Sequence, residues 1–197
     1  MKRGIFGLLF AATLLSASPA FAIFNVQVLG GQRSSEFKND SSSIDLSGSE
    51  LRFAAHLDPI PLVPVGFGVA FAQTTFDEDG TKVDGTDIDL ELEAWLPLEI
   101  AGLVPFAKIG YTVGGEYEVE FDDLAGVKSK FKPSGASLHV GIKYEFLLRI
   151  GIMAEVEFAN RELDYDSTSG APANLQVEAD DSKQKSTSIL IGAQAGI

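Results

Sequence analysis

The sequence lacks, or has few of, the residues that form disulfides or bind metal ions in exported proteins. It has no cysteine, so no disulfide can stabilise it. Two scattered histidines, His56 and His139, are too few for a zinc site. After the N-terminus no apolar run approaches the length of a membrane-spanning helix. The net charge of −13 argues against a nucleic-acid partner. We therefore expect no metal, no cofactor and no nucleic acid.

The N-terminus has the pattern of a secretory signal peptide. Lys2 and Arg3 form a basic start, residues 5–15 are apolar, and Ala20-Phe21-Ala22 fits a cleavage site. The apolar run is too short to serve as a membrane anchor. The sequence thus predicts a cleaved segment over residues 1–22 and one exported domain over residues 23–197.

Strict alternation of apolar and polar residues marks the stretch 136–158. Val140, Ile142 and Tyr144 share one face of a strand, while charged residues and glycines occupy the other. Residues 147–149 separate two such arms, which predicts a hairpin. Pairing centred on this bend places Tyr144 opposite Ile152, Ile142 opposite Ala154 and Val140 opposite Val156.

The same period of two recurs along the rest of the chain. It predicts eight strands in total, and their expected positions are 24–33, 48–57, 63–76, 86–98, 105–121, 136–146, 150–165 and 185–197. Long polar loops over residues 34–47, 77–85, 122–134 and 166–184 alternate with short turns. An even number of strands with this asymmetry is typical of an up-and-down membrane barrel.

The choice between a soluble and a membrane barrel depends on which face points outward. A soluble barrel would place the apolar set inside, and lipocalins are the alternative of this kind. Gly66, Gly68, Ala70 and Ala72 would then make a poor water-facing surface, and the bulky set would overfill a narrow interior. We therefore expect large side chains to face lipid and small or charged ones to face the lumen. A closed barrel satisfies every backbone group in hydrocarbon.

With these features the chain resembles the small eight-stranded outer-membrane barrels, such as the outer-membrane-protein-A-like and W-like families. The resemblance implies an all-β, antiparallel, eight-stranded transmembrane barrel in the outer membrane of a Gram-negative-type bacterium. It implies contact with outer-membrane lipid and lipopolysaccharide, insertion by the barrel-assembly machinery and a monomeric state. Such proteins commonly end in an aromatic residue, whereas this sequence ends in Ile197.

The alternation also predicts which charges share the lumen. We expect an interior ion-pair network that plugs the barrel, formed by Arg52, Glu91, Glu93, Lys108, His139, Lys143, Glu155 and Glu157. Strand register predicts Glu93 opposite Lys108, His139 opposite Glu157, Lys143 diagonal to Glu155, and Arg52 opposite Ala70. The same face carries further charges at Glu50, His56, Asp87, Asp89, Glu145 and Arg161, as well as Trp95.

Three function classes follow from this reading. The first is a structural or surface-interaction role exerted through extracellular loops, without enzymatic activity. The second is a narrow pore or a transporter of small or hydrophobic molecules. The third is a lipid-modifying enzyme built on Ser137 and His139, which we expect to lie too far apart for a hydrogen bond. The basic run of Lys128, Lys130 and Lys132 is placed in a loop, where it could contact lipopolysaccharide phosphates or simply face water.

Overall fold

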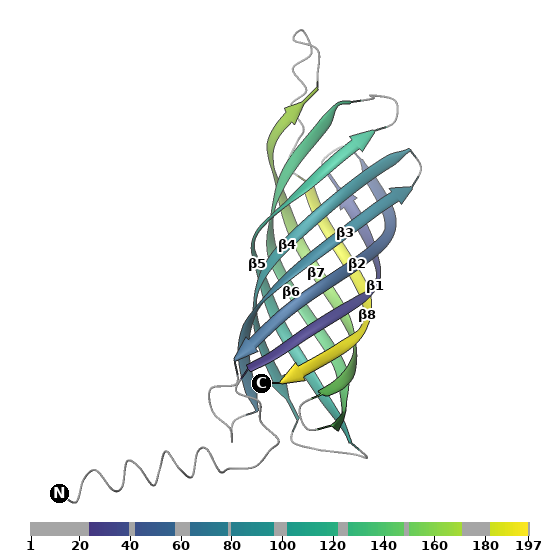
Figure 1. Cartoon of the computed structure of the whole chain (residues 1–197). Coiled ribbons are helices and arrows are strands. Elements are labelled where there is room, and N and C mark those ends of the chain that lie inside the picture. Colours follow the sequence, from purple (N-terminus) through teal and green to yellow (C-terminus); the bar gives the residue numbers. More distant parts are fainter. Residues whose placement is uncertain are drawn as a thin grey trace, which may run out of the picture.

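The chain forms a single closed barrel of eight antiparallel strands in sequence order, with β1 also pairing with β8 (Figure 1). This is a computed structural model, and it describes residues 24–39, 42–57, 64–78, 80–96, 102–121, 126–147, 150–170 and 182–196. The predicted signal peptide lies outside the described residues. The strands are β1 (Phe24–Lys38), β2 (Ser43–Leu57), β3 (Val65–Glu78), β4 (Thr81–Trp95), β5 (Leu103–Phe121), β6 (Lys128–Leu147), β7 (Ile150–Ser169) and β8 (Ser182–Gly196). Among the described residues, no helix is long and apolar enough to cross a membrane.

The bulky apolar set faces outward, as the alternation predicted. Phe67 and Leu90 are 51% exposed, whereas Glu91 and Glu155 are 4% and 2% exposed. A soluble barrel would show the reverse, with carboxylates at the surface and aliphatic side chains inside. The arrangement is that of a barrel whose wall contacts hydrocarbon.

The central hairpin pairs in the predicted register. Tyr144 lies opposite Ile152, Ile142 opposite Ala154, and Val140 opposite Val156. The register of this hairpin is confirmed. It runs without a shift from Phe131 to Glu145 on β6, so the alternation fixes which side of the wall each residue in this stretch faces.

The strands are longer than the sequence predicted at the end away from the termini. The expected loop over residues 34–47 is mostly strand, since β1 continues to Lys38 and β2 begins at Ser43. Residues 128–134, expected in a loop, belong to β6. The prediction failed there because both faces of these extensions are largely polar, so no apolar alternation marks them.

A bulge in β5 changes which residues face inward. Ile88 pairs with Gly114 and Asp89 with Thr112, which leaves Val113 as an extra residue. An inserted residue shifts the alternation by one position. Lys108 and Thr112 therefore face inward before the bulge, and Tyr117 faces inward after it.

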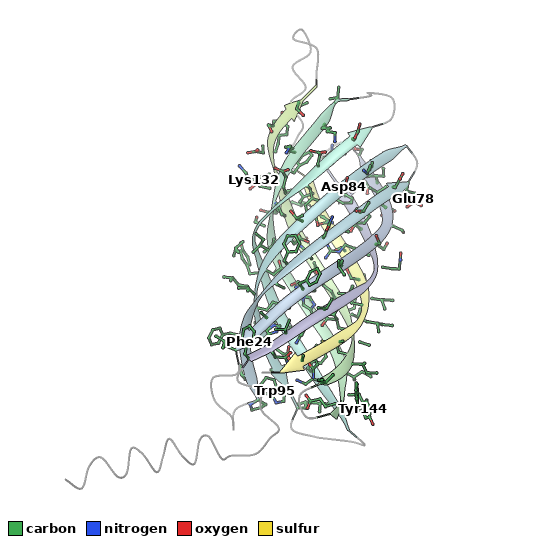
Figure 2. The ribbon with its side chains drawn as sticks, in the orientation of Figure 1. Phe24, Glu78, Asp84, Trp95, Lys132 and Tyr144 are labelled. Atoms are coloured by element: carbon green, nitrogen blue, oxygen red, sulfur yellow. The ribbon has the colours of Figure 1, made fainter. Side chains whose placement is uncertain are left out.

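Two apolar clusters contribute to the interior. We call the first the lower cluster, which lies toward the termini and comprises Leu29, Trp95, Phe106, Met153 and Leu190. The upper cluster comprises Leu46, Phe76, Val83, Tyr117, Phe131 and Leu163. Figure 2 shows Trp95 near the same end of the barrel as Phe24 and Tyr144, and Glu78, Asp84 and Lys132 near the opposite end. The lower cluster is interleaved with charged residues, since Met153 lies opposite Lys143 and Leu190 lies opposite Glu155. The charged side chains of the interior form the candidate site.

Candidate functional site in the barrel interior

All eight residues of the predicted network lie in the barrel interior. Each of them is 8% exposed or less, and the eight are Arg52, Glu91, Glu93, Lys108, His139, Lys143, Glu155 and Glu157. Alternate positions on β2, β4, β5, β6 and β7 place them there, since side chains two apart share a face of a strand. Buried charges need partners, and the contacts below supply them.

Arg33 stands at the centre of the network, although the sequence analysis did not include it. Its Nε donates to Glu50 at 2.9 Å and to Ser188 at 3.1 Å. Its Nη1 donates to Asp87 at 3.0 Å and to the Tyr117 hydroxyl at 3.1 Å. One guanidinium thus ties β1 to β2, β4, β5 and β8. It has the planar fork of donors that suits several carboxylates at once.

Arg52 reaches across the lumen as expected, but from a different register. It lies opposite Ala72, two residues from the predicted Ala70. Its Nη2 donates to Asp89 at 2.9 Å and to Glu91 at 2.7 Å, both on β4. The small side chains of β3 leave room for this reach, so the space predicted for it is supplied by the next alanine along the strand.

The two lysines of the network contact carboxylates that the strand register alone did not predict. Glu93 lies opposite Lys108, as predicted. The Lys108 ammonium nevertheless sits 2.7 Å from Glu155 and donates to Gln27 at 3.0 Å. The partner of Glu93 is instead Lys143, at 3.5 Å. The expected diagonal contact of Lys143 with Glu155 is therefore replaced, because long side chains lean across the lumen rather than along the wall.

A second arginine and Trp95 complete the lining. Arg161 lies 3.0 Å from Glu157 and 3.3 Å from Asp87. The Lys143 ammonium lies 4.9 Å from the centroid of the Trp95 ring, a distance at which a cation and an aromatic face attract. Trp95 is thus a lumen residue, as its parity predicted.

The expectation that Ser137 and His139 lie too far apart is wrong. Ser137 Oγ lies 3.1 Å from His139 Nε2, and His139 Nδ1 lies 3.3 Å from Glu155. His139 also lies directly opposite Glu157, as predicted. Residues two apart share a face of the strand, and the long histidine side chain spans the distance to the serine hydroxyl. The resulting serine, histidine and carboxylate chain is buried.

Two further observations bound the chemistry of the interior. Glu145, expected in the lumen, is exposed at the terminus-side end, where Gln194 donates to it at 3.0 Å. Within the described part of the chain, no three histidine, cysteine or acidic residues are grouped so that they could hold a metal ion. The many carboxylates are instead engaged by arginine and lysine.

Outside the membrane-facing zone, the basic run lies on a strand and is ion-paired. Lys128 contacts Glu118 at 2.5 Å, Lys130 contacts Glu116 at 2.7 Å, and Lys132 donates to Asp166. The hydrogen bond from Lys132 lowers the pKa of Asp166 below its ordinary value. These lysines already have carboxylate partners, which weakens the alternative that they receive lipopolysaccharide phosphates.

Two functional residues escaped the sequence reasoning for different reasons. Arg33 ends the predicted first strand and has the inward parity of Asn25 and Gln27, so applying the same rule to the last residue of that strand would have found it. Tyr117 enters the interior only because of the bulge, and no pattern in the sequence marks that extra residue.

Comparison with known families and structures gives a consistent result. A family model described as "Outer membrane protein beta-barrel domain" matches residues 7–195. No curated protein matches the chain in sequence. Among solved structures, Neisserial surface protein A has a TM-score of 0.63 at 12% identity, covering 88% of this chain and 97% of that one. At this identity the likeness concerns the fold alone.

Two other solved structures are less similar. The outer membrane protein OprG from Pseudomonas aeruginosa has a TM-score of 0.49 at 12% identity, covering 91% of this chain and 98% of that one. Ail, the attachment invasion locus protein of Yersinia pestis, has a TM-score of 0.44 at 15% identity, with 87% and 98% covered.

Proposed function

The chain belongs to the family of outer membrane protein β-barrel domains, and on this premise we propose that it is a closed barrel acting through its outer surface. It is an outer-membrane protein of eight strands in a lipid and lipopolysaccharide environment. The proposed role is structural or surface-interacting, with the far ends of the strands and their loops directed outside the cell. We further propose that it is a monomer inserted by the barrel-assembly machinery.

The single observation that supports this proposal is the filling of the lumen. The charged network and the lower apolar cluster fill one part of the interior together, and the upper apolar cluster fills the part toward the other end. An interior of eight strands is just wide enough for side chains to fill. Water and ions would have to displace the apolar side chains and break buried ion pairs to pass. A plugged barrel presents a rigid platform for surface contacts rather than a path.

Planar-bilayer recording tests the closed lumen. The purified protein, folded as judged by altered migration of the unheated sample in a gel, should give no steady conductance. Liposome swelling with small sugars should likewise stay at the level of protein-free vesicles. A steady, cation-selective current from the unaltered protein would overturn the proposal and favour the pore.

One observation favours a hydrolase as a second candidate. The contacts among Ser137, His139 and Glu155 have the residue types and the order of a nucleophile, a base and an orienting carboxylate. The three side chains are buried, so a substrate would need to enter the lumen. Labelling with a serine-reactive fluorophosphonate discriminates the two candidates. We expect no labelling, and labelling that Ser137→Ala abolishes would establish a reactive serine and sink the purely structural role.

A further inference from the structure

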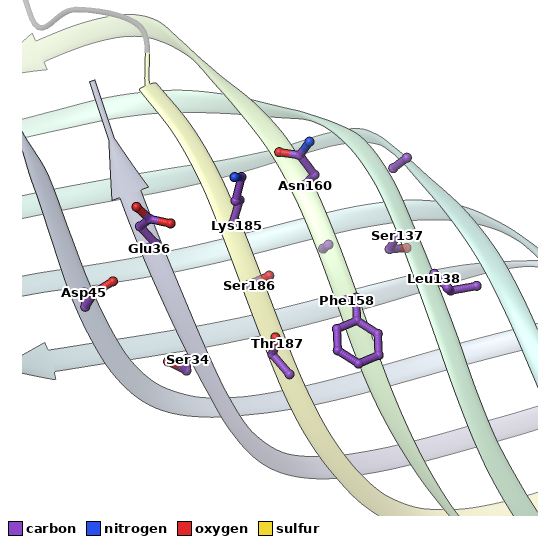
Figure 3. Close-up of a pocket in the computed structure, with 12 residues that line it drawn as sticks. Ser34, Glu36, Asp45, Ser137, Leu138, Phe158, Asn160, Lys185, Ser186 and Thr187 are labelled. Carbon is purple, nitrogen blue, oxygen red and sulfur yellow. The ribbon is translucent and has the colours of Figure 1, made fainter. Parts of the chain in front are cut away.

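A pocket of about 610 Å³ opens on the outer wall of the barrel, where β6, β7, β8, β1 and β2 run side by side (Figure 3). Leu138 and Phe158 form its apolar side, and the small polar residues Ser34 and Thr187 form its middle. Behind this part of the wall the inward side chains that line the pocket are also small: Ser137, Ala159 and Ser186. Small residues on both faces let the wall lie deeper here than where bulky side chains stand.

The pocket lies at the upper edge of the apolar belt. On β7, Phe158 is the last large apolar residue that faces outward, and Asn160 follows it on the same face. On β8 the same step leads from Ile189 through Thr187 to Lys185. The pocket therefore spans the boundary at which acyl chains give way to polar headgroups.

Lys185 lines the pocket, and together with two lysines next to it on β1 and β8 it differs from the other exposed lysines of the barrel. Lys82, Lys128, Lys130 and Lys132 each have a carboxylate partner within 3.0 Å. Lys38, Lys183 and Lys185 are exposed, and no ion pair within 4.0 Å connects any of them to a described carboxylate.

These three lysines also lie together. Lys38 is directly opposite Lys183, and Lys185 is two residues further along β8 on the same face. Among the described residues, the other exposed lysines are thus ion-paired and these three are not, although Lys185 lies directly opposite Glu36 and Lys183 lies opposite Glu162. A cationic cluster above an apolar seat has the chemistry that recognises an anionic lipid.

We infer that this pocket seats one phosphorylated lipid of the outer leaflet, with an acyl chain against Phe158 and Leu138 and the phosphate at Lys183 and Lys185. Glu36 and Asp45 line the opposite side, where they accept hydrogen bonds from hydroxyl or amine groups of the head. The inference rests on the orientation given under the proposed function, in which this end of the barrel faces outside. A protein partner fits less well, because the apolar side is continuous with the lipid-facing belt.

Native mass spectrometry in a non-denaturing detergent tests the seat, with diphosphorylated lipid A as the probe. The unaltered protein should retain one lipid A and no comparable amount of phosphatidylcholine. The variant K183A/K185A should retain lipid A roughly 30-fold more weakly at low salt, given the effect of each lysine near a charged lipid. K128A/K130A removes the same charge from lysines that are ion-paired elsewhere, and it should behave as the unaltered protein.

A variant that fills the pocket distinguishes lipid binding in the pocket from non-specific attraction to the lysines. Thr187→Trp keeps every lysine and fills the pocket, so lipid A retention should fall as in K183A/K185A. Equal losses in K183A/K185A and K128A/K130A would overturn the inference. So would displacement of the lipid by inorganic phosphate alone, undiminished retention in Thr187→Trp, or a dimer in place of the lipid adduct.

Failure of this inference can be told apart from failure of the closed-lumen proposal. Conductance reports on the lumen and not on the outer wall, so a conducting barrel can still retain lipid A. Orientation is read separately from Lys183→Cys, since the native chain has no cysteine. An impermeant maleimide should label this variant in intact cells, and protection there would remove the premise of an outer-leaflet ligand.

Discussion

Every nitrogen of the Arg33 guanidinium donates to a side chain on another strand, so this one residue joins distant parts of the barrel wall. Its Nη2 donates to Glu50 at 3.1 Å and to Glu157 at 3.3 Å, in addition to the contacts of Nε and Nη1. Its side chain is fully buried. Removing one member of a buried charge cluster leaves the others without compensation, which costs far more than losing a surface pair.

Arg33→Met tests this at a single residue. The side chain keeps much of its volume but leaves Glu50, Asp87 and Glu157 with one cation fewer. We expect the free energy of unfolding in lipid vesicles, measured by urea titration, to fall by about 3–5 kcal/mol.

Lys82→Met is the matched control for Arg33→Met. Lys82 also lies near a carboxylate, at 3.0 Å from Asp84, but both side chains are about half exposed. Its loss should cost far less than the loss of Arg33, because water and salt screen an exposed pair. Equal effects of the two substitutions would show that the buried contacts of Arg33 stabilise the barrel no more than an exposed ion pair does.

Asp166 offers a prediction about protonation outside the membrane. The hydrogen bond from Lys132, followed by its charge, lowers the pKa of this carboxyl. A carboxyl whose pKa is lower in the folded than in the unfolded state adds stability at pH values above its unfolded-state pKa. This contribution is lost as the pH falls through the folded-state pKa. Carbon-detected NMR titration should place the Asp166 midpoint below that of an ordinary aspartate, and Lys132→Ala should return it to the ordinary range. An unchanged midpoint in that variant would contradict the assigned cause.

At the scale of an element, the bulge in β5 redirects the strand rather than merely interrupting it. The paired rows of β5 and β6 break between Thr112 and Tyr117, and Gly115 has a φ of +131° within this break. Glycine adopts such a φ without strain, and other residues rarely do. The bulge brings the Tyr117 hydroxyl to 3.1 Å from Asp87. It therefore links the upper cluster to the charged network.

Gly115→Ala should disturb this element selectively. A Cβ there would lie 2.0 Å from the backbone oxygen of Thr86, and the φ is strained for alanine. We expect a loss of about 1–3 kcal/mol in unfolding free energy, and more if the bulge must move. Gly114→Ala is the control, because its Cβ would meet only Ile88 at 3.9 Å. Urea titration in lipid vesicles measures both losses of unfolding free energy. Comparable losses in the two variants would argue that the bulge is not required.

How far the sequence predicts each element depends on where that element lies. Between lipid and lumen the two faces differ sharply, so Val140 and Glu155 were assigned to the correct sides. Above the belt that contrast disappears, and Ser43 to Ser47 were mistaken for a loop. Register predicted Glu93 opposite Lys108 but not the partner that the ammonium takes. Long flexible side chains choose among several carboxylates, and that choice depends on packing which the alternation does not encode.

Along the whole molecule, a zone in which charged residues and the lower apolar cluster are interleaved gives way to the upper apolar cluster. The buried carboxylates outnumber the buried arginines and lysines by seven to five among the described residues. The carboxylates are Glu50, Asp87, Asp89, Glu91, Glu93, Glu155 and Glu157, and the bases are Arg33, Arg52, Lys108, Lys143 and Arg161. Apolar layers oppose ions through desolvation, whereas a zone with excess carboxylate admits cations once they arrive. We therefore expect either apolar cluster, together with the buried ion pairs, to keep the lumen closed.

This arrangement predicts how the barrel could be opened. Trp95→Ala with Phe106→Ala thins the lower cluster, and Phe76→Ala with Phe131→Ala thins the upper one. Each pair alone should leave the bilayer current at the level of the unaltered protein, because the other apolar cluster and the buried ion pairs remain. All four substitutions together should give a steady current that favours cations over anions, following the excess of buried carboxylate.

The control for these variants removes similar volume from the lipid-facing wall. Leu90→Ala with Leu138→Ala alters residues that are 51% and 46% exposed, and it should stay silent in the same bilayer. If either inner pair alone conducts as well as the fourfold variant, the two apolar clusters are not independent barriers. If the fourfold variant folds, as its unheated gel migration would show, and passes no current, the charged zone itself closes the barrel. An anion-selective current would instead mean that the arginines and lysines govern the path, contrary to the balance of buried charge.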